Sequence, residues 1–137
     1  MNISSREVYV TRKILEPGLS MLSRECKVTL NTKSTPPSKA EIIRNIAGKD
    51  AILCTVSDRI DSQIIDAAGP NLKVISSYSS GYDHIDIKEA TRRGIYVTFT
   101  SEIPVEATAD LTFALMLSCA RNIVNGDRFV KENKWKF

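Results

Sequence analysis

Residues 72–98 read LKVISSYSSGYDHIDIKEATRRGIYVT, and this stretch contains one complete strand–loop–helix–strand repeat. Its two ends, Lys73–Ser76 and Ile95–Thr98, are short runs rich in β-branched residues, which predicts two strands. Asp86 opens a D-x-x-E capping pattern and Gly94 is a stop signal, so a helix is predicted between the strands. This order indicates two parallel strands joined by a helix.

The same alternation runs through the preceding residues. Apolar, β-branched runs predict three further strands at Glu7–Thr11, Lys27–Leu30 and Ala51–Val56. Start signals predict the helices between them, at Pro17, at the Ser38–Glu41 capping box and at Asp61. The apolar residues expected on the inner faces of the second and third helices are Ile42, Ile43, Ile46, Ile64, Ile65 and Ala68. Five strands alternating with helices predict an α/β domain with a parallel, flavodoxin-like sheet.

After the fifth strand the pattern changes. A long helix is predicted from Pro104 to about Asn125, and residues 111–120 (LTFALMLSCA) make it apolar on nearly every face. Such a helix must be buried on several sides, and only Gly126–Phe137 follow it. We therefore expect a fragment of a longer protein or an obligate oligomer, with one domain over residues 1–100 and a linker helix starting a second domain over residues 101–137.

The composition fits one globular domain. The chain has 137 residues, of which 42% are apolar and 26% charged, and its net charge of +3 is scattered along the sequence. Scattered charge argues weakly against nucleic acid as a partner. No secretory signal or membrane span is evident, so a cytoplasmic protein is expected. Cys26, Cys54 and Cys119 are isolated, which disfavours disulfides and a zinc site.

Three loops follow the carboxyl ends of predicted strands, where open parallel sheets bind ligands. They are Thr11–Lys13, Val56–Arg59 and Ser79–Tyr82. The last contains Gly81 between small hydroxylated residues and a capped helix, so its backbone N–H groups could approach a carboxylate closely. On spacing alone, an ordinary turn between strand and helix is the commoner explanation.

Several ordered motifs resemble one family. They are SDRID (57–61), GYDHID (81–86), RGIYVT (93–98) and ATAD (107–110), the last opening the long apolar helix. In this order the chain resembles the D-isomer-specific 2-hydroxyacid dehydrogenases, especially their glyoxylate/hydroxypyruvate reductase branch. The resemblance covers essentially all of the chain but only the first part of a family member.

The resemblance implies a fold and a function. In such enzymes a flavodoxin-like substrate domain is joined by the long helix to a Rossmann domain, and NAD or NADP reduces small 2-oxo acids to D-2-hydroxy acids. Matched by position, the amides of Ser80 and Gly81 would receive the substrate carboxylate, and Val56 and Ser57 would form the opposite wall. Thr108 would lie near the dinucleotide.

The same resemblance implies that no catalytic residue lies in this chain. The family's acid/base histidine, its glutamate partner and its arginine lie further downstream, and His84 matches a position that helps to hold a turn. Tyr82, Asp83 and Asp86 match structural positions, and a metal site from Asp83, His84 and Asp86 is disfavoured.

The sequence departs from the family at three places. Ser80 stands where the family usually has valine or a similar residue, Phe99–Ser101 stands in place of Asn-Thr-Pro, and Asp110 stands where glutamate is commoner. These changes leave the implied fold intact.

The chain contains no G-x-G-x-x-G motif, so it would end before the cofactor turn. We expect the chain alone to be inactive and to bind no cofactor.

Two other classes of function are alternatives for this sequence. One is a non-catalytic module that self-associates, or pairs with a longer relative, through helix 104–125. The other is a different flavodoxin-like function. Arg12-Lys13 after the first strand disfavours a phospho-receiver, and residues 11–18 (TRKILEPG) do not form a flavin phosphate loop.

Overall fold

The computed structural model describes residues 6–102 and 104–136. The chain divides into two compact units, Met1–Ser101 (unit 1) and Glu102–Phe137 (unit 2). Each unit is described by itself.

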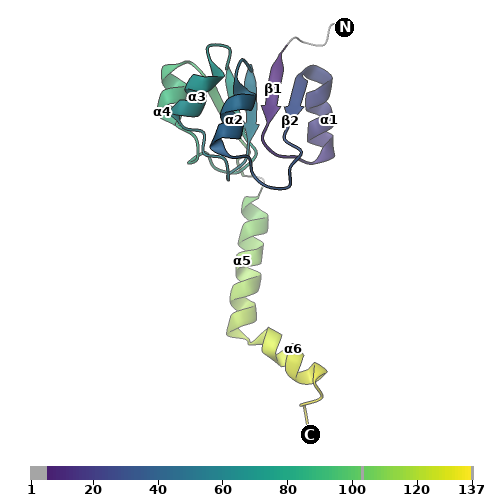
Figure 1. The fold of residues 1–137 in the computed structure, drawn as a ribbon. Helices are drawn as coiled ribbons and strands as arrows, with labels where there is room; N and C mark the ends of the chain where they lie inside the picture. The colour runs from purple at the N-terminus through teal and green to yellow at the C-terminus, as the bar shows by residue number, and fades with distance from the viewer. Residues whose placement is uncertain (1–5, 103, 137) are drawn as a thin grey trace. The chain divides into compact units, whose positions relative to one another are not determined.

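Unit 1 alternates strands and helices along the chain (Figure 1). Its strands are β1 (Glu7–Val10), β2 (Lys27–Leu30), β3 (Ala51–Cys54), β4 (Val74–Ser77) and β5 (Tyr96–Phe99). Its helices are α1 (Glu16–Glu25), α2 (Lys39–Ile46), α3 (Ser62–Ala68) and α4 (Ile87–Arg92). Each lies within a few residues of its predicted position.

The five strands form one parallel sheet in the order β2-β1-β3-β4-β5. This is the flavodoxin-like order, so the predicted fold class is confirmed. The pairing of β3 with β4, from Ala51 opposite Val74 to Cys54 opposite Ser77, aligns the carboxyl ends of these two central strands.

Three helices of unit 1 begin with the predicted caps. Ser38 and Glu41 form a full capping box at α2, and the carboxylates of Asp61 and Asp86 accept backbone N–H groups at the starts of α3 and α4. By contrast, α1 begins after Leu15 with no side-chain cap. The inner-face residues Ile42, Ile46, Ile64, Ile65 and Ala68 are buried as predicted, and Ile43 is partly buried.

The two faces of the sheet differ. Tyr9, Ile52, Cys54 and Ile75 point to the face over which α2, α3 and α4 lie side by side, and they belong to one buried cluster (Figure 1). On the other face, a hollow of about 510 Å³ remains beside α1. Its apolar lining residues include Val8, Leu22, Leu53, Val74 and Tyr96. The Tyr96 side chain on this face is 75% exposed.

The third strand ends earlier than predicted. The run Ala51–Val56 was expected to be extended throughout, but β3 stops at Cys54. The Thr55 N–H donates to the Asp58 carboxylate (2.8 Å), and the Asp58 N–H donates back to the Thr55 carbonyl (3.0 Å). This local turn replaces strand pairing, so Val56 lies in a loop.

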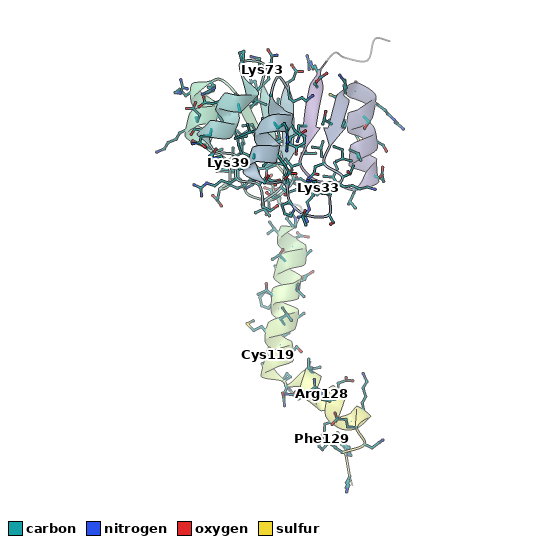
Figure 2. The ribbon with its side chains drawn as sticks, in the orientation of Figure 1. Lys33, Lys39, Lys73, Cys119, Arg128 and Phe129 are labelled. Carbon is teal, nitrogen blue, oxygen red and sulfur yellow. The ribbon has the colours of Figure 1, made fainter. Side chains whose placement is uncertain are left out.

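Unit 2 contains α5 (Val105–Ala120) and α6 (Ile123–Lys131). The prediction of one continuous helix from Pro104 to about Asn125 is wrong, because Asn122 adopts a left-handed conformation (φ 52°) and ends the first helix. Neither helix has a buried residue among those described. Side chains project along both helices (Figure 2), and the exposed apolar ones on α5 include Leu111, Phe113, Leu115, Met116 and Leu117. Within residues 6–102 and 104–136, no helix is both long and apolar enough to cross a membrane.

Candidate functional site

Two loops meet at the carboxyl edge of the sheet, one after β3 (residues 55–59) and one after β4 (residues 78–84). Where the loops begin, the Tyr78 N–H donates to the Cys54 carbonyl (2.7 Å). Where they end, the Ile60 N–H donates to the His84 carbonyl (2.8 Å), and the Asp86 N–H donates to the Ile60 carbonyl (2.9 Å). The two loops are therefore tied to each other at both ends and form two neighbouring walls.

Asp58 organises the loop after β3. Its side chain is 2% exposed, and its Oδ2 accepts from the Thr11 hydroxyl (2.6 Å) and from both the N–H and the hydroxyl of Thr55 (2.8 and 2.9 Å). Its Oδ1 is buried without a partner among the described residues. A buried carboxylate with three donors fixes this loop relative to β1.

The predicted residues Val56 and Ser57 lie on this first wall. Both are exposed, and the Ser57 hydroxyl lies 2.9 Å from the Thr55 hydroxyl. In the described part of the chain, the N–H groups of Val56 and Ser57 have no hydrogen-bond acceptor. The wall therefore offers an apolar side chain, a hydroxyl and free amides.

The other two predicted residues, Ser80 and Gly81, lie on the loop after β4. Ser80 is exposed and Gly81 is half-buried. Their N–H groups likewise have no acceptor within residues 6–102 and 104–136. Unpaired consecutive amides at the end of a parallel strand are suited to binding an anion.

Beneath this second loop lies a polar network that the sequence did not reveal. The Ser77 hydroxyl lies 3.2 Å from the Nε2 atom of His84, and the Cys54 sulfur lies 3.9 Å from the same nitrogen. Burial lowers the pKa of His84, although the carboxylates of Asp58 and Asp83 act against this shift. Burial, with a smaller effect from Asp58, raises the pKa of Cys54 to about 12. The imidazole is therefore mainly neutral at neutral pH, and the thiol is protonated and unreactive.

Two residues near this loop have structural roles. The Tyr82 ring packs on Phe99, with 4.9 Å between the ring centroids. Asp86 accepts the Glu89 N–H (3.0 Å) at the start of α4. Among the described residues, no group of three or more His, Cys, Asp or Glu side chains could hold a metal ion.

Thr108 belongs to unit 2. It lies in the first turn of α5, where its hydroxyl donates to the Pro104 carbonyl (2.6 Å). The N-terminal turn of a helix favours negative charge.

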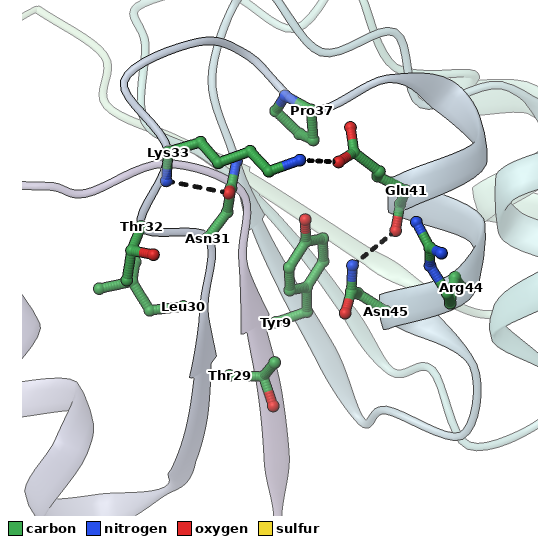
Figure 3. A pocket seen from close by; sticks show the side chains of 10 residues that line it. All are labelled: Tyr9, Thr29, Leu30, Asn31, Thr32, Lys33, Pro37, Glu41, Arg44 and Asn45. Atoms are coloured by element: carbon green, nitrogen blue, oxygen red, sulfur yellow. Dashed lines mark hydrogen bonds and ion pairs between the residues drawn. The ribbon is translucent and has the colours of Figure 1, made fainter.

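A separate hollow of about 310 Å³ lies beyond the ends of β1 and β2 (Figure 3). The Lys33 ammonium is paired with the Glu41 carboxylate, and the Asn45 amide donates to the Glu41 carbonyl (2.7 Å). The Asn31 side chain is also paired, because its amide oxygen accepts the Lys33 N–H (3.2 Å) and its amide N–H donates to the Thr11 carbonyl (3.0 Å). Since these polar groups already have partners, the two loops after β3 and β4 form the better candidate site.

The amino-acid sequence is similar to those of known proteins. Residues 8–127 match the model of a family described as D-isomer specific 2-hydroxyacid dehydrogenase, catalytic domain. The chain is 53% identical to a glyoxylate reductase from Thermofilum pendens over 130 residues, which cover 94% of the chain and 38% of the reductase. It is 46% identical to a glyoxylate reductase from Korarchaeum cryptofilum over 129 residues, which cover 94% of the chain and 39% of that protein.

A solved structure agrees with these matches. The TT0316 protein from Thermus thermophilus superposes with a TM-score of 0.82 at 41% identity, covering 96% of this chain and 42% of that one. The chain thus spans about two-fifths of the length of each of these proteins.

Proposed function

The chain belongs to the D-isomer specific 2-hydroxyacid dehydrogenase family, and on this premise we propose that unit 1 binds the substrate of an oxidoreductase. The family is NAD(P)-dependent and acts on small 2-oxo and 2-hydroxy acids. The proposed reaction of the whole protein is the reduction of 2-oxo acids such as glyoxylate or hydroxypyruvate to D-2-hydroxy acids. The names of its relatives support this choice of substrate.

The observation that carries the proposal is the glycine at position 81. Its φ lies outside the left-handed range, and a Cβ there would meet only the Asp83 carboxylate, at an ordinary 3.9 Å. Neither the backbone nor the packing of unit 1 therefore requires glycine. A missing side chain instead leaves the amides of Ser80 and Gly81 open to a carboxylate.

The opposite wall suits the remainder of a small 2-oxo acid. In this proposal Val56 gives apolar contact and Ser57 gives a polar one, both held in place by Asp58. Contacts with both walls would orient the substrate so that its carboxylate lies on the amides of the loop after β4. Orientation of the reacting carbon is the part of the catalysis that unit 1 would supply.

The described residues supply only part of a binding site for the cofactor. NAD(P)H supplies the hydride when it is bound, and we propose that Thr108, at the positive end of α5, lies near it. The sequence offers no glycine-rich turn for a pyrophosphate, so the residues present fit only the edge of a dinucleotide site. His84 is the only histidine of the chain, and its Nε2 faces Ser77. We infer that the 137 residues alone bind no cofactor and transfer no hydride.

The proposal is tested by titrating the full chain with glyoxylate while amide chemical shifts are recorded by NMR. Glyoxylate should shift the Ser80 and Gly81 amides, with a dissociation constant on the order of 1 mM or weaker because unit 1 contacts so small a ligand through two loops only. Glycolaldehyde, which lacks the carboxylate, should not. In this proposal Gly81→Ala should abolish the shift without loss of stability, because the added Cβ fits the fold but limits how closely an anion can approach the backbone.

The matched control is Gly126→Ala, since a Cβ at Gly126 meets nothing within 4 Å and the residue lies in α6, which is not part of the proposed site. The proposal fails if glyoxylate leaves the Ser80 and Gly81 amides unmoved, or if Gly81→Ala binds it as well as the unchanged chain. Glyoxylate-dependent oxidation of NADH or NADPH by the pure chain would contradict the inference that it is inactive alone.

A second candidate function follows from α5. Its apolar side chains, among them Phe113, Leu115 and Leu117, are more than half exposed, and exposed apolar surface of this kind marks an interaction site. We propose that the chain pairs with another copy through this helix. Light scattering should show a dimer that Leu115→Glu converts to a monomer. A monomer at high concentration in the unchanged chain would exclude this function.

A further inference from the structure

The Ser77 side chain, at the last residue of β4, is 2% exposed and lies beneath the loop after that strand. Its hydroxyl lies 2.6 Å from the Ser79 hydroxyl, 3.0 Å from the Gly81 carbonyl and 3.2 Å from the Nε2 atom of His84. The Ser79 hydroxyl in turn donates to the Gly81 carbonyl (2.8 Å). Side chains from one short segment thus converge on a single carbonyl oxygen.

The hydrogen atoms available determine the direction of this chain. The two hydroxyls provide one hydrogen each, and a neutral imidazole provides one N–H. If His84 donates from Nε2 to Ser77, the two hydroxyl hydrogens serve two of the three contacts among Ser77, Ser79 and the Gly81 carbonyl. If Nε2 instead accepts from Ser77, only the Ser79 hydrogen is left for those three contacts. This count assigns the Nε2–H tautomer to His84.

The tethered carbonyl has a consequence for the next amide. The peptide bonds described are trans, and in a trans peptide the C=O and the following N–H point in opposite directions. Holding the Gly81 carbonyl against Ser77 and Ser79 therefore turns the Tyr82 N–H away from the interior. That N–H has no acceptor among the described residues.

We propose that Ser77 and His84 are positioning residues that hold the Gly81 carbonyl inward, and that the Tyr82 amide consequently joins those of Ser80 and Gly81 as a third donor to the bound anion. This inference rests on the proposed function in so far as the anion is a substrate carboxylate. The orientation of the loop does not depend on any ligand.

The chain provides matched variants for a test. Ser77→Ala removes the central hydroxyl. Ser76→Ala removes the neighbouring one, which lies outside the network and accepts from Thr98 (3.0 Å). His84→Leu removes the ring nitrogen, and His84→Gln keeps an amide N–H near the position of Nε2. If Ser77→Ala does not fold, the comparison of His84→Leu with His84→Gln still tests the positioning role.

The first measurement is the ¹⁵N order parameter of the backbone amides of residues 79–82 in the ligand-free full chain. Ser77→Ala and His84→Leu should lower these order parameters from about 0.85, typical of a rigid backbone, to below about 0.6, because the loop loses its anchor. Ser76→Ala and His84→Gln should leave them near about 0.85. Equal order parameters in all four variants would overturn the positioning role, whether or not the chain binds glyoxylate.

The second measurement is the glyoxylate titration by NMR. Glyoxylate should shift the Tyr82 amide together with those of Ser80 and Gly81. Ser77→Ala should weaken glyoxylate binding about tenfold. The affinity of His84→Gln should stay within about twofold of that of the unchanged chain. If glyoxylate shifts Ser80 and Gly81 but not Tyr82, the third donor is refuted while the proposed function stands. If none of the three amides moves, the proposed function fails and the order parameters alone decide the positioning role.

Discussion

The two faces of the sheet carry similar residues with different surroundings. Ile75 and Val74 are neighbours on β4, yet Ile75 is fully buried beneath α2, α3 and α4, whereas Val74 lines the hollow beside α1. A parallel sheet of this kind is normally covered on both faces. The comparison indicates that most of the buried core of unit 1 lies on one face, while the other face, where Val8 and Val10 are buried, still retains apolar surface that could be covered.

The largest expected effect comes from deleting a side chain on each face. Ile75→Ala should lower the free energy of unfolding by about 3 kcal/mol, because it leaves a cavity in the buried cluster. Val74→Ala, one residue away, should cost less than about 1 kcal/mol because its site is already open. Urea denaturation of both variants measures the difference. Equal losses would mean that the second face is covered in solution.

The helix caps should show a smaller difference of the same kind. The caps of α2, α3 and α4 are side chains, whereas α1 beside the hollow has none. Asp61→Ala should cost about 1 kcal/mol, and Leu15→Ser should add a few tenths by supplying the missing acceptor. Thermal unfolding measures both changes. A destabilising Leu15→Ser would show that this exposed side chain makes contacts in solution.

The smallest effect concerns pH and the covered face. Because burial holds the pKa of His84 below its ordinary value of 6.5, the unfolded chain binds the proton more readily than the folded one. The contribution is fully present above about pH 6.5 and is lost as the pH falls from there through the folded-state pKa. Urea midpoints at about pH 7.5 and about pH 5.5 should differ less in His84→Gln than in the unchanged chain. An unaltered pH dependence would show that His84 is not the group responsible.

Much of unit 1 could be predicted because its signals are local. Ser38, Asp61 and Asp86 each cap a helix within three residues of themselves, and short apolar runs marked all five strands. The end of β3 was missed because the Asp58 side chain competes with strand pairing for the Thr55 N–H. The end of α5 was missed because asparagine tolerates the left-handed conformation that Asn122 adopts.

The site was less accessible to sequence reasoning. The loops that carry Val56, Ser57, Ser80 and Gly81 could be located from strand order and family resemblance, and the roles of these residues remain proposals. The contact from Thr11 to Asp58 spans 47 residues, so no local pattern indicates it. The Ser77 network lies within one loop, but a serine in an SSYSSG run looks like any other small turn residue. Only its burial distinguishes it.

The position of β5 has a consequence for handling the protein. This strand forms one edge of the sheet, and residues 95–100 (IYVTFT) contain no charge, proline or glycine. The opposite edge strand, β2, begins with Lys27, whose charge opposes such contacts. An uncharged edge is a template on which another chain can add a strand through backbone hydrogen bonds. Aggregation of unit 1 should therefore begin at β5, and a lysine on that strand should delay it.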